Sequence, residues 1–360
     1  MILVVCLNPA LDITLSVPVV DWAGVNRPRA VEVRPGGKGV NVARTLRALG
    51  EEVLVTGLAG GANGQALTAG LARLALPAEL IPIAGETRRT FAVRDEARRT
   101  VALFNEPGLQ VLAAEFGEFL FSYKRLLTGC SAVVLSGSLP PGLPADTYAT
   151  LIRTAGVAAL NHPRNTSNSS HIGDSGHGGV PVVLDAHGEA LRLGVAAGPA
   201  IVKPNLAELE DLAGQPLSLA GDGTGRPSVA SAAAGLRSAG AGAVVVSLGP
   251  AGLYADTAAG GWRVVPPPVD AANPTGAGDA VAAGLTRGLV HDEPWPDRLR
   301  SAAALGTASA LAPVAGEFAG EDYQRVLAGV TLNEIPPARY GSAEDAGSAG
   351  RAHHGNGGAG

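Results

Sequence analysis

The sequence predicts an α/β protein with a doubly wound, mostly parallel sheet, and three observations favour this class. Short apolar runs rich in β-branched residues recur along the chain, as expected of parallel strands that are buried on both faces. Helix-length stretches separate these runs, which is typical of βα units. Glycine, serine or charged residues follow the runs, at the end of the strand where parallel sheets bind ligands. The runs predicted as strands are ILVVCLN, EEVLVTGLAG, SAVVLSGS, VPVVLDA, AIVKPN and GAVVVSLG.

The stretches between these strands carry helical patterns. In residues 40–49, Val42, Leu46 and Leu49 recur near helical spacing, and Gly50 is suited to cap the end of the helix. Further helices are predicted for GQALTAGLARL, ADTYATLIRTAG, AELEDLAG and the stretch from residue 280 onward.

Two segments, residues 13–34 and 89–105, alternate apolar and polar residues instead. The second reads RTFAV and TVALF around the charged turn DEARR, a pattern typical of an antiparallel hairpin with one solvated face. We expect both segments to form lid strands beside the parallel core.

The chain reads as one domain over residues 1–335. Residues 161–179 are polar and rich in Ser, Asn and Gly where connections are usually short, so we interpret them as a disordered insertion. Residues 336–360 lack an apolar period, and we expect a disordered tail there.

The composition excludes several kinds of partner. Hydrophobic residues make up 46% of the chain and charged residues 16%, and the net charge is −5 without clusters of basic residues, so no nucleic-acid interface is expected. The two cysteines, Cys6 and Cys130, match no metal spacing and favour a reducing compartment. The apolar start is interrupted at Asn8 and Asp12 and has no basic region, so we expect a cytoplasmic protein without a membrane segment.

The stretch NPTGAGDA, residues 273–280, joins a glycine-rich turn to a predicted helix. Such a turn gathers free backbone N–H groups and the positive end of the helix dipole, which together bind phosphate. It also contains a carboxylate, Asp279, and we expect the dipole to keep this group ionised.

A second glycine cluster, RPGGKGVN at residues 34–41, leads into the first long helix. Its glycines let a ligand approach the backbone, while Lys38 supplies a positive charge and Asn41 a polar group. The pattern favours a phosphorylated, polyhydroxy ligand, and a simple strand-to-helix turn is the alternative. The sequence contains neither a Walker phosphate loop nor a GxGxxG dinucleotide motif after the first strand.

Polar residues follow several of the predicted strands. Asp12 lies just past the first strand, Ser138 lies in SGSLPPG, Lys203 in KPNLAEL and Ser247 in SLGPAG. Since the carboxyl ends of parallel strands share one edge of the sheet, these residues predict one continuous cleft.

Together, the motifs GGKGVNVARTLRALG, SGSLPPG, KPNLAEL, SLGPAG and NPTGAGDA resemble the ribokinase-like carbohydrate kinases of the phosphofructokinase B (PfkB) type. The resemblance covers residues 1–330 apart from the insertion. It is greatest to the branch that contains 1-phosphofructokinase, tagatose-6-phosphate kinase and the minor 6-phosphofructokinase. It implies a doubly wound α/β domain with a small β-strand lid, and transfer of the γ-phosphate of ATP to a sugar hydroxyl.

The resemblance implies a role for each matching residue. Asp279 matches the catalytic base, and the anion hole is formed by the backbone N–H groups of Gly276, Ala277 and Gly278. The residues expected to bind the sugar phosphate are Asp12, Gly37, Lys38, Asn41 and Arg88, with Ser138 and Arg27 as helpers. Those expected to bind ATP are Lys203, Asn205, Ser247, Gly249 and Gly252, and Glu208 is expected in the magnesium–water network.

Two departures from the family pattern are visible. Asp185-Ala186-His187-Gly188 replaces the usual Asp-(Ser/Thr)-Ser-Gly, so contacts beneath the phosphates are expected to differ. Asn273 stands where ribokinase has a potassium-ligating Asp, which leaves a K⁺ requirement open beside the implied Mg²⁺ and the co-substrate ATP.

The resemblance predicts a kinase of a ketohexose phosphate and leaves three acceptors open: fructose 1-phosphate, tagatose 6-phosphate and fructose 6-phosphate. A kinase of a free sugar or a nucleoside is the alternative within the class, and Arg88 with SGSLPPG disfavours it. A non-catalytic sensor of sugar phosphate and ATP is the alternative from another class, and Asp279 disfavours that one. Lid strands pair between subunits in relatives, so a homodimer is a further hypothesis.

Overall fold

The computed structural model describes residues 1–158, 179–219 and 226–335. The predicted tail at 336–360 and the predicted insertion at 161–179, apart from Gly179, lie outside the described residues.

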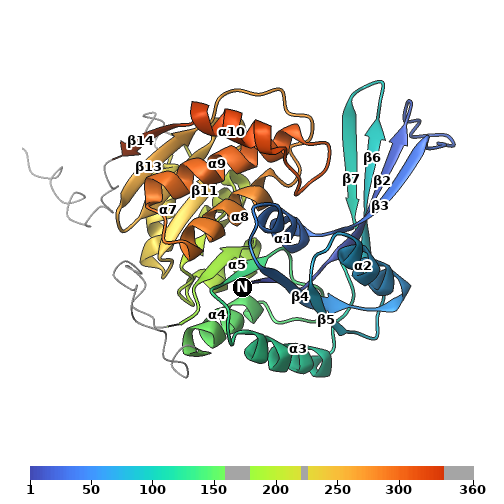
Figure 1. Ribbon diagram of the computed structural model, residues 1–360, viewed down its shortest axis with the longest axis horizontal. Helices are drawn as coiled ribbons and strands as arrows, with labels where there is room; N and C mark the ends of the chain where they lie inside the picture. The colour runs from blue at the N-terminus through green and yellow to red at the C-terminus, as the bar shows by residue number, and fades with distance from the viewer. Residues whose placement is uncertain (159–178, 220–225, 336–360) are drawn as a thin grey trace, which may run out of the picture.

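A wide central sheet forms the body of the molecule (Figure 1). Its strands, in order across the sheet, are β14 (Thr331–Ile335), β13 (Gly260–Val265), β12 (Leu253–Thr257), β11 (Ala243–Ser247), β10 (Ile201–Val202), β9 (Val182–Asp185), β8 (Ala132–Ser136), β1 (Ile2–Cys6), β4 (Val53–Ala59) and β5 (Ala78–Pro82). All neighbours from β11 to β5 pair in parallel, and β12, β13 and β14 extend one side of the sheet in antiparallel pairing. The predicted fold class, a doubly wound and mostly parallel sheet, is therefore confirmed.

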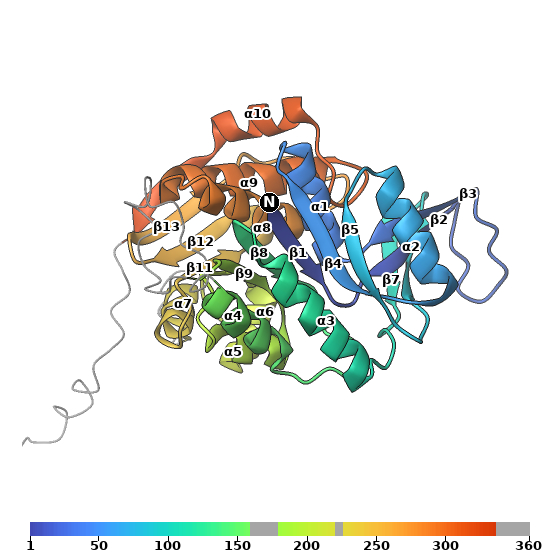
Figure 2. The same ribbon diagram turned by 60° about the horizontal axis from the view of Figure 1, so that its bottom comes forward.

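Helices cover both faces of this sheet (Figure 2). Strand residues alternate between the faces: Val4 belongs to one hydrophobic cluster and its neighbour Val5 to the other. The helices that contribute to the first cluster are α1 (Lys38–Ala48), α2 (Gly61–Arg73), α8 (Ala277–Val290), α9 (Trp295–Leu311) and α10 (Gly320–Gly329). Those of the second cluster are α3 (Ala113–Leu126), α4 (Thr147–Ala158), α5 (Gly188–Val195), α6 (Leu206–Ala213) and α7 (Val229–Ser238).

A second, smaller sheet projects from the body as a lid (Figure 1). Its strands, in order, are β3 (Ala30–Gly36), β2 (Ala10–Val17), β6 (Arg88–Asp95) and β7 (Thr100–Asn105). The pairs β2–β3 and β6–β7 are antiparallel hairpins, and β2 pairs with β6 in parallel. Because β3 runs directly into α1, the lid is continuous with the helix that carries the GGKG motif.

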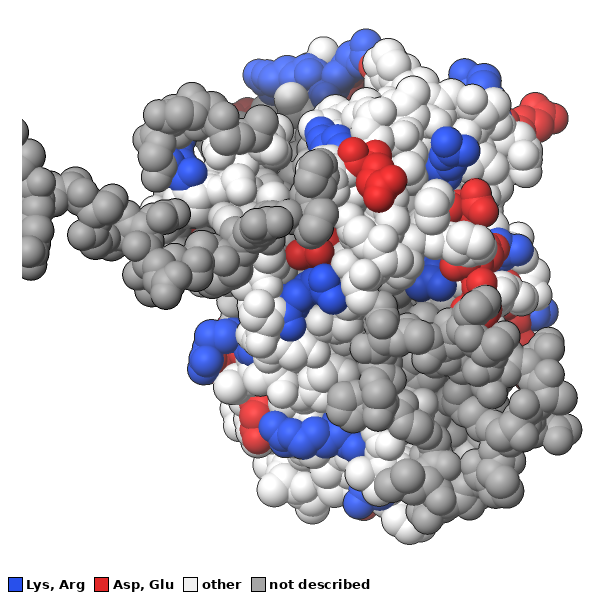
Figure 3. All heavy atoms as spheres, turned by 90° about the vertical axis from the view of Figure 1, so that its left-hand side faces the viewer, with Lys and Arg blue, Asp and Glu red and all other residues white. Residues whose placement is uncertain are grey.

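None of the helices in the described part of the chain is long and apolar enough to cross a membrane. On the face drawn in Figure 3, basic and acidic side chains are interspersed.

Candidate active site

The carboxyl ends of the central strands bring polar side chains to one edge of the sheet. Ser136 and Asp185 end β8 and β9 and are direct neighbours in the sheet, where the Ser136 hydroxyl donates to Asp185 Oδ2 at 3.4 Å. Lys203 directly follows β10, and Ser247 ends β11. The cleft predicted from the strand ends therefore has a structural basis in parallel strand order.

Asp279 and Asn41 meet where α8 packs against α1, although they lie 238 positions apart in the chain. Asn41 Nδ2 donates to Asp279 Oδ2 at 2.9 Å, and both side chains are buried. Gly37, the residue before α1, has φ 102° and lets the chain turn from the lid into the helix that carries Asn41. Asn41, which is expected to bind the sugar, thus holds Asp279, which is expected to be the catalytic base.

The glycine turn before α8 is packed on two sides. Gly276 has φ 87°, and a Cβ there would lie 2.8 Å from Ala315 Cβ, so only glycine fits. Ala277 and Gly278 open the helix, where backbone N–H groups have no intrahelical partner. A Cβ built on Gly278 would lie 3.5 Å from Lys203 Nζ, so an ammonium group stands beside this turn. The arrangement suits an anion such as a phosphoryl group.

The pKa of Asp279 differs from the expectation of an ionised group. Burial, and next the negative charge of Asp185, raise the pKa of Asp279 to about 7. The Asn41 hydrogen bond and the charges of Lys38 and Lys203 act in the opposite direction but do not offset the burial. A pKa near the operating pH is what a general base requires.

Two lysines and two carboxylates form an ion-pair cluster next to Asp279. Lys203 Nζ lies 3.2 Å and Lys38 Nζ 3.5 Å from Asp185 Oδ1, and Lys38 Nζ lies 3.2 Å from Glu208 Oε1. Burial raises the pKa of Asp185, but the two lysines outweigh it and hold that pKa below its ordinary value. Burial lowers the pKa of Lys38, but Asp185 and Glu208 raise it above its ordinary value. Lys38, which the sequence placed with the sugar, therefore lies among the residues expected on the ATP side.

The other residues expected to bind ATP lie beside this cluster. Asn205 Oδ1 accepts from Glu208 N at 2.8 Å, and Glu208 Oε2 accepts from Asn205 N at 2.9 Å, which is a capping box at the start of α6. Asn205 also forms an isolated bridge with Ser247, and Gly249 and Gly252 lie in the turn that follows. The capping box fixes the Glu208 carboxylate at the edge of the cleft.

The residues expected to bind the acceptor gather where the lid meets the body. Asp12 Oδ1 accepts a hydrogen bond of 2.5 Å from Thr90 Oγ1 on the neighbouring lid strand. Arg88 Nε donates to Asn8 O at 3.0 Å, and Asn8 Nδ2 donates to Ser138 Oγ at 3.0 Å. Asn8 thus links Arg88 to Ser138, and Thr90 holds Asp12; the sequence assigned a role to neither Asn8 nor Thr90.

Asp185 is a further residue of the cluster to which the sequence assigned no role. The sequence does contain an indication of its role, because Asp185 ends the apolar run VPVVLDA at the same sheet edge as Lys203. His187, two residues later, is exposed and lines a cavity of about 430 Å³ next to Ser138.

Arg27 is not brought to the other acceptor residues within this chain. It is exposed in the loop at residues 18–29, beyond the end of the hairpin where Ser16 pairs with Ala30. Asp12 lies near the opposite end of β2, where the strand leaves the body. The expected contact of Arg27 with the acceptor stays a prediction.

Comparison with known proteins identifies the class of the molecule. The family model for pfkB family carbohydrate kinases matches residues 2–319. Phosphofructokinase-2 from Escherichia coli, solved in complex with potassium, has a TM-score of 0.78 and 30% identity, covering 91% of this chain and 98% of its own. A putative phosphofructokinase from Staphylococcus aureus has a TM-score of 0.73 and 25% identity, covering 94% and 100%. A possible 1-phosphofructokinase from Thermotoga maritima shares the fold, with a TM-score of 0.75 and 24% identity, covering 93% and 99%.

The fold and the site define a ribokinase-like phosphotransferase that uses an alcohol group as acceptor. The chain belongs to the pfkB family of carbohydrate kinases.

Asp279→Asn is expected to stabilise the folded chain at alkaline pH. The folded-state pKa of Asp279, about 7, exceeds the ordinary value of 3.8, so the folded state binds this proton more tightly than the unfolded chain. The contribution of Asp279 to stability is therefore lost as the pH rises from about 4 to about 7. The melting temperature of the variant should exceed that of the wild type at about pH 8, and the difference should shrink towards about pH 4. A difference that does not change with pH would contradict the raised pKa.

Proposed function

We propose that the protein is an ATP-dependent phosphosugar kinase that transfers the γ-phosphate of ATP to a hydroxyl of a ketohexose phosphate. The observation that carries this proposal is the buried Asp279, held beside the glycine turn by Asn41 of α1, the helix that continues from the lid. Escherichia coli phosphofructokinase-2 has been solved in complex with fructose-6-phosphate. For this chain we infer one of three acceptors: fructose 1-phosphate, tagatose 6-phosphate or fructose 6-phosphate.

On the acceptor side, Asp12 and Arg88 have complementary tasks. The Asp12 carboxylate accepts from sugar hydroxyls, and the positive charge of Arg88 binds the phosphate that the acceptor already carries. The backbone carbonyls of Asn8 and Glu106 orient the Arg88 guanidinium, with N···O distances of 3.0 and 3.1 Å. A planar donor that is fixed in this way binds phosphate with directional specificity. Ser138, Asn41 and Gly37 complete the acceptor side in the proposal.

In the proposed reaction, Asp279 accepts the proton of the acceptor hydroxyl. The hydroxyl oxygen forms a bond to the γ-phosphorus, the bond from that phosphorus to the bridging oxygen breaks, and ADP leaves with the bond's electrons. The N–H groups of Gly276, Ala277 and Gly278 stabilise the charge on the oxygens of the transferred group. Lys203 adds a positive charge on the same side.

On the nucleotide side, we assign ATP to Lys203, Asn205, Ser247, Gly249 and Gly252. Asp185 and Glu208 fit Mg²⁺, because this ion takes oxygen ligands and is usually held by one or two carboxylates together with substrate phosphates and water. In the described part of the chain, no group of three or more His, Cys, Asp or Glu side chains could hold a metal ion without such help. When bound, Mg²⁺ neutralises charge on the phosphates.

Asn273 does not fit the role of a monovalent-cation ligand. Its Oδ1 accepts from Thr275 N at 3.0 Å, and its Nδ2 donates to Pro313 O at 3.2 Å. The amide therefore joins the glycine turn before α8 to the loop at residues 312–319 without a bound cation. The proposed reaction therefore assigns no role to K⁺.

We place the reaction in the cytoplasm, where ATP is available. Cys6 and Cys130 are both free thiols, as is usual in a reducing compartment.

A panel of acceptors tests the proposal directly. The purified protein is supplied with ATP and Mg²⁺ and with each ketohexose phosphate, free fructose, ribose or adenosine, and ADP release is measured. We expect turnover with at least one ketohexose phosphate and much lower kcat/KM with the unphosphorylated compounds. Turnover of a free sugar or nucleoside alone would contradict the proposed acceptor, and ATP binding without turnover would indicate a sensor.

Asp279→Asn is expected to lower kcat by about 10²- to 10⁴-fold, since the general base is lost while the binding groups stay in place. ATP and acceptor affinities, measured by calorimetry, should change little. Asp292→Asn is a matched control, because Asp292 is exposed and its φ of 52° is a conformation that Asn tolerates. Full activity of the Asp279 variant would remove this residue from its role.

Arg88→Ala is expected to raise KM for a phosphorylated acceptor by roughly 10-fold or more, because a charge-assisted contact with phosphate is lost. Any activity with free fructose should not change. Arg89→Ala is the control, since the neighbouring Arg89 is exposed and pairs with Glu106 at 2.8 Å. Equal effects on free and phosphorylated sugars would argue against a phosphate contact.

We also propose that the chain forms a homodimer through the outer face of the lid. Strand register puts Val31 and Val33 on the face opposite Asp12 and Thr90, and these two valines are 59% and 56% exposed. Contiguous exposed apolar patches usually mark interaction sites. The residues of this outer face are Ile13, Leu15, Val31, Val33, Phe91, Val93 and Phe104.

The substitutions Val31→Glu and Val33→Glu together are expected to convert a dimer to a monomer, because they place charge in an apolar contact. Light scattering after size-exclusion chromatography measures the mass. Val101→Glu is the control, since Val101 is 54% exposed but lies on the other face of the lid. A wild type that is monomeric at assay concentrations would contradict the proposal.

A further inference from the structure

A buried arginine, Arg44, joins α1 to the loop at residues 312–319 between α9 and α10. Its side chain is only 8% exposed. Arg44 Nη1 donates to Ala315 O at 3.0 Å, and Nη2 pairs with the Glu317 carboxylate. The next residue, Thr45, donates from Oγ1 to Gly316 O at 3.3 Å. One turn of α1 therefore holds three consecutive residues of the 312–319 loop.

This loop is wedged between the two parts of the site that act on the transferred phosphate. On one side, a Cβ at Gly276 would lie 2.8 Å from Ala315 Cβ and 3.0 Å from Gly316 N. On the other side, a Cβ at Gly316 would lie 2.9 Å from Asn41 Cα. Because neither glycine leaves room for a side-chain carbon, the loop packs directly against the glycine turn and against α1. A shift of the loop therefore displaces the glycine turn or Asn41, the residue that holds Asp279.

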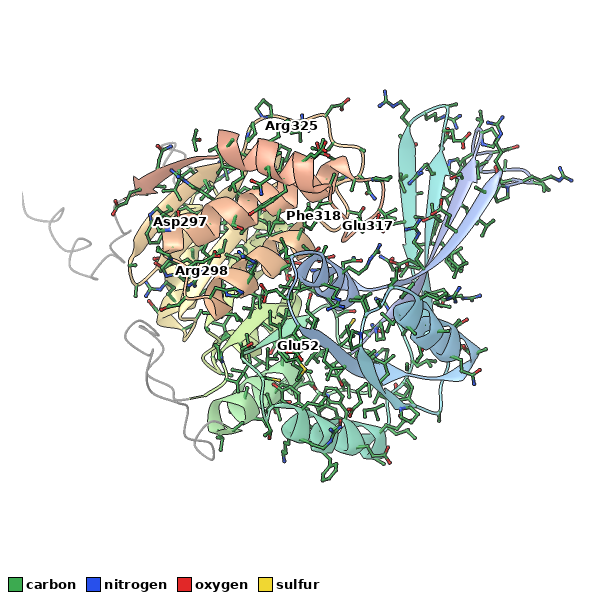
Figure 4. The ribbon with its side chains drawn as sticks, viewed as in Figure 1. Glu52, Asp297, Arg298, Glu317, Phe318 and Arg325 are labelled. Carbon is green, nitrogen blue, oxygen red and sulfur yellow. The ribbon has the colours of Figure 1, made fainter. Side chains whose placement is uncertain are left out.

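The same loop also contacts the base of the lid. Glu317 lies on the part of the loop that faces the lid, whereas Phe318 lies nearer the helices (Figure 4) and packs edge-on against Tyr323 of α10. Arg34 Nη1 lies 3.4 Å from Glu317 Oε1, and Arg34 is paired with Asp12 in the register of β2 and β3. Glu317 is thus shared by a lid arginine and by Arg44.

We propose, on the basis of the proposed function, that Arg44 is a positioning residue for phosphoryl transfer. Through Ala315 and the adjoining Gly316 it sets the place of the Gly276 turn relative to Asn41. Through Glu317 and Arg34 it ties that geometry to β3, the lid strand that pairs with the Asp12 strand β2. Binding of the acceptor against Asp12 then fixes the lid and the anion-binding turn together. Arginine is required because its planar fork serves two acceptors in different directions, which a lysine ammonium on a flexible stem does not do.

The test compares kcat and KM in Arg44→Met and Arg44→Lys, using whichever acceptor the wild type phosphorylates. A displacement of about 1 Å in a catalytic group costs up to about 100-fold in rate. We expect kcat to fall by about 10- to 100-fold in Arg44→Met and by less in Arg44→Lys, while KM for ATP stays within about 3-fold. Arg47→Met is the matched control, because Arg47 lies on the same helix and is exposed.

A purely structural role gives a different result. In that case the melting temperature of Arg44→Met falls, but kcat per folded molecule, measured well below that temperature, equals that of the wild type, and the proposal is overturned. An equal loss of kcat in Arg47→Met overturns it as well. This test also distinguishes failure of the positioning role from failure of the proposed function. If the wild type turns over, Asp279→Asn is inactive and Arg44→Met is unaffected, only the positioning role is rejected.

Glu317→Gln keeps the proposal open to test if Arg44→Met does not fold. This variant keeps the shape of the side chain and removes the charge that Arg44 and Arg34 share. We expect a lower kcat together with a higher acceptor KM, because the link to the lid is weakened, and an unchanged KM for ATP. Wild-type values for kcat and for the acceptor KM in Glu317→Gln would overturn the link between lid and loop.

Discussion

The hydrogen bond between Asn41 and Asp279 is the interaction on which the rest of the site depends. Asn41 lies on the helix that continues from the lid, and Asp279 lies in the first turn of the helix that follows the glycine turn. A single buried contact of 2.9 Å therefore fixes the acceptor side relative to the phosphate side. Because the contact is shielded from water, it is stronger than at a surface, and its loss leaves a buried carboxylate without this partner.

The charges around this contact explain why Asp279 is not a simple ionised residue. Lys38 and Lys203 stand beside three carboxylates, those of Asp185, Glu208 and Asp279. Asp185 takes the larger share of the lysine charge, since both ammonium groups lie within 3.5 Å of its Oδ1. The pKa of Asp279, by contrast, is raised to about 7. One cluster therefore contains a carboxylate that stays ionised, Asp185, and a carboxylate that titrates near neutral pH, Asp279.

Much of this arrangement could be predicted from sequence, because strand ends and glycine turns carry local signals. The last two strands on one side of the sheet, β13 and the edge strand β14, could not be predicted, since short pieces such as GGWRVV and TLNEI have no period that indicates their partner. Spacing also does not show how a long side chain turns, so the pairing of Lys38 with Glu208 could not be predicted from the GGKG motif. The pKa of Asp279 depends on burial and on Asp185, and both are properties of the assembled fold. The position of Arg27 depends on the length of its hairpin rather than on its motif.

The alternation of faces along the lid strands restricts which changes of sequence the lid tolerates. Its strands have a period of two, so residues that face the cleft alternate with residues of the outer apolar face. Insertion or deletion of a single residue within β2 would move Asp12 to the outer face and turn Ile13 and Leu15 towards the cleft. Such a one-residue shift in register would remove the Asp12 carboxylate from the acceptor side and disrupt the outer apolar face at the same time. Evolution of acceptor preference in this strand is therefore expected to proceed by substitution and by changes in the loop at residues 18–29, where length can vary without reversing the faces.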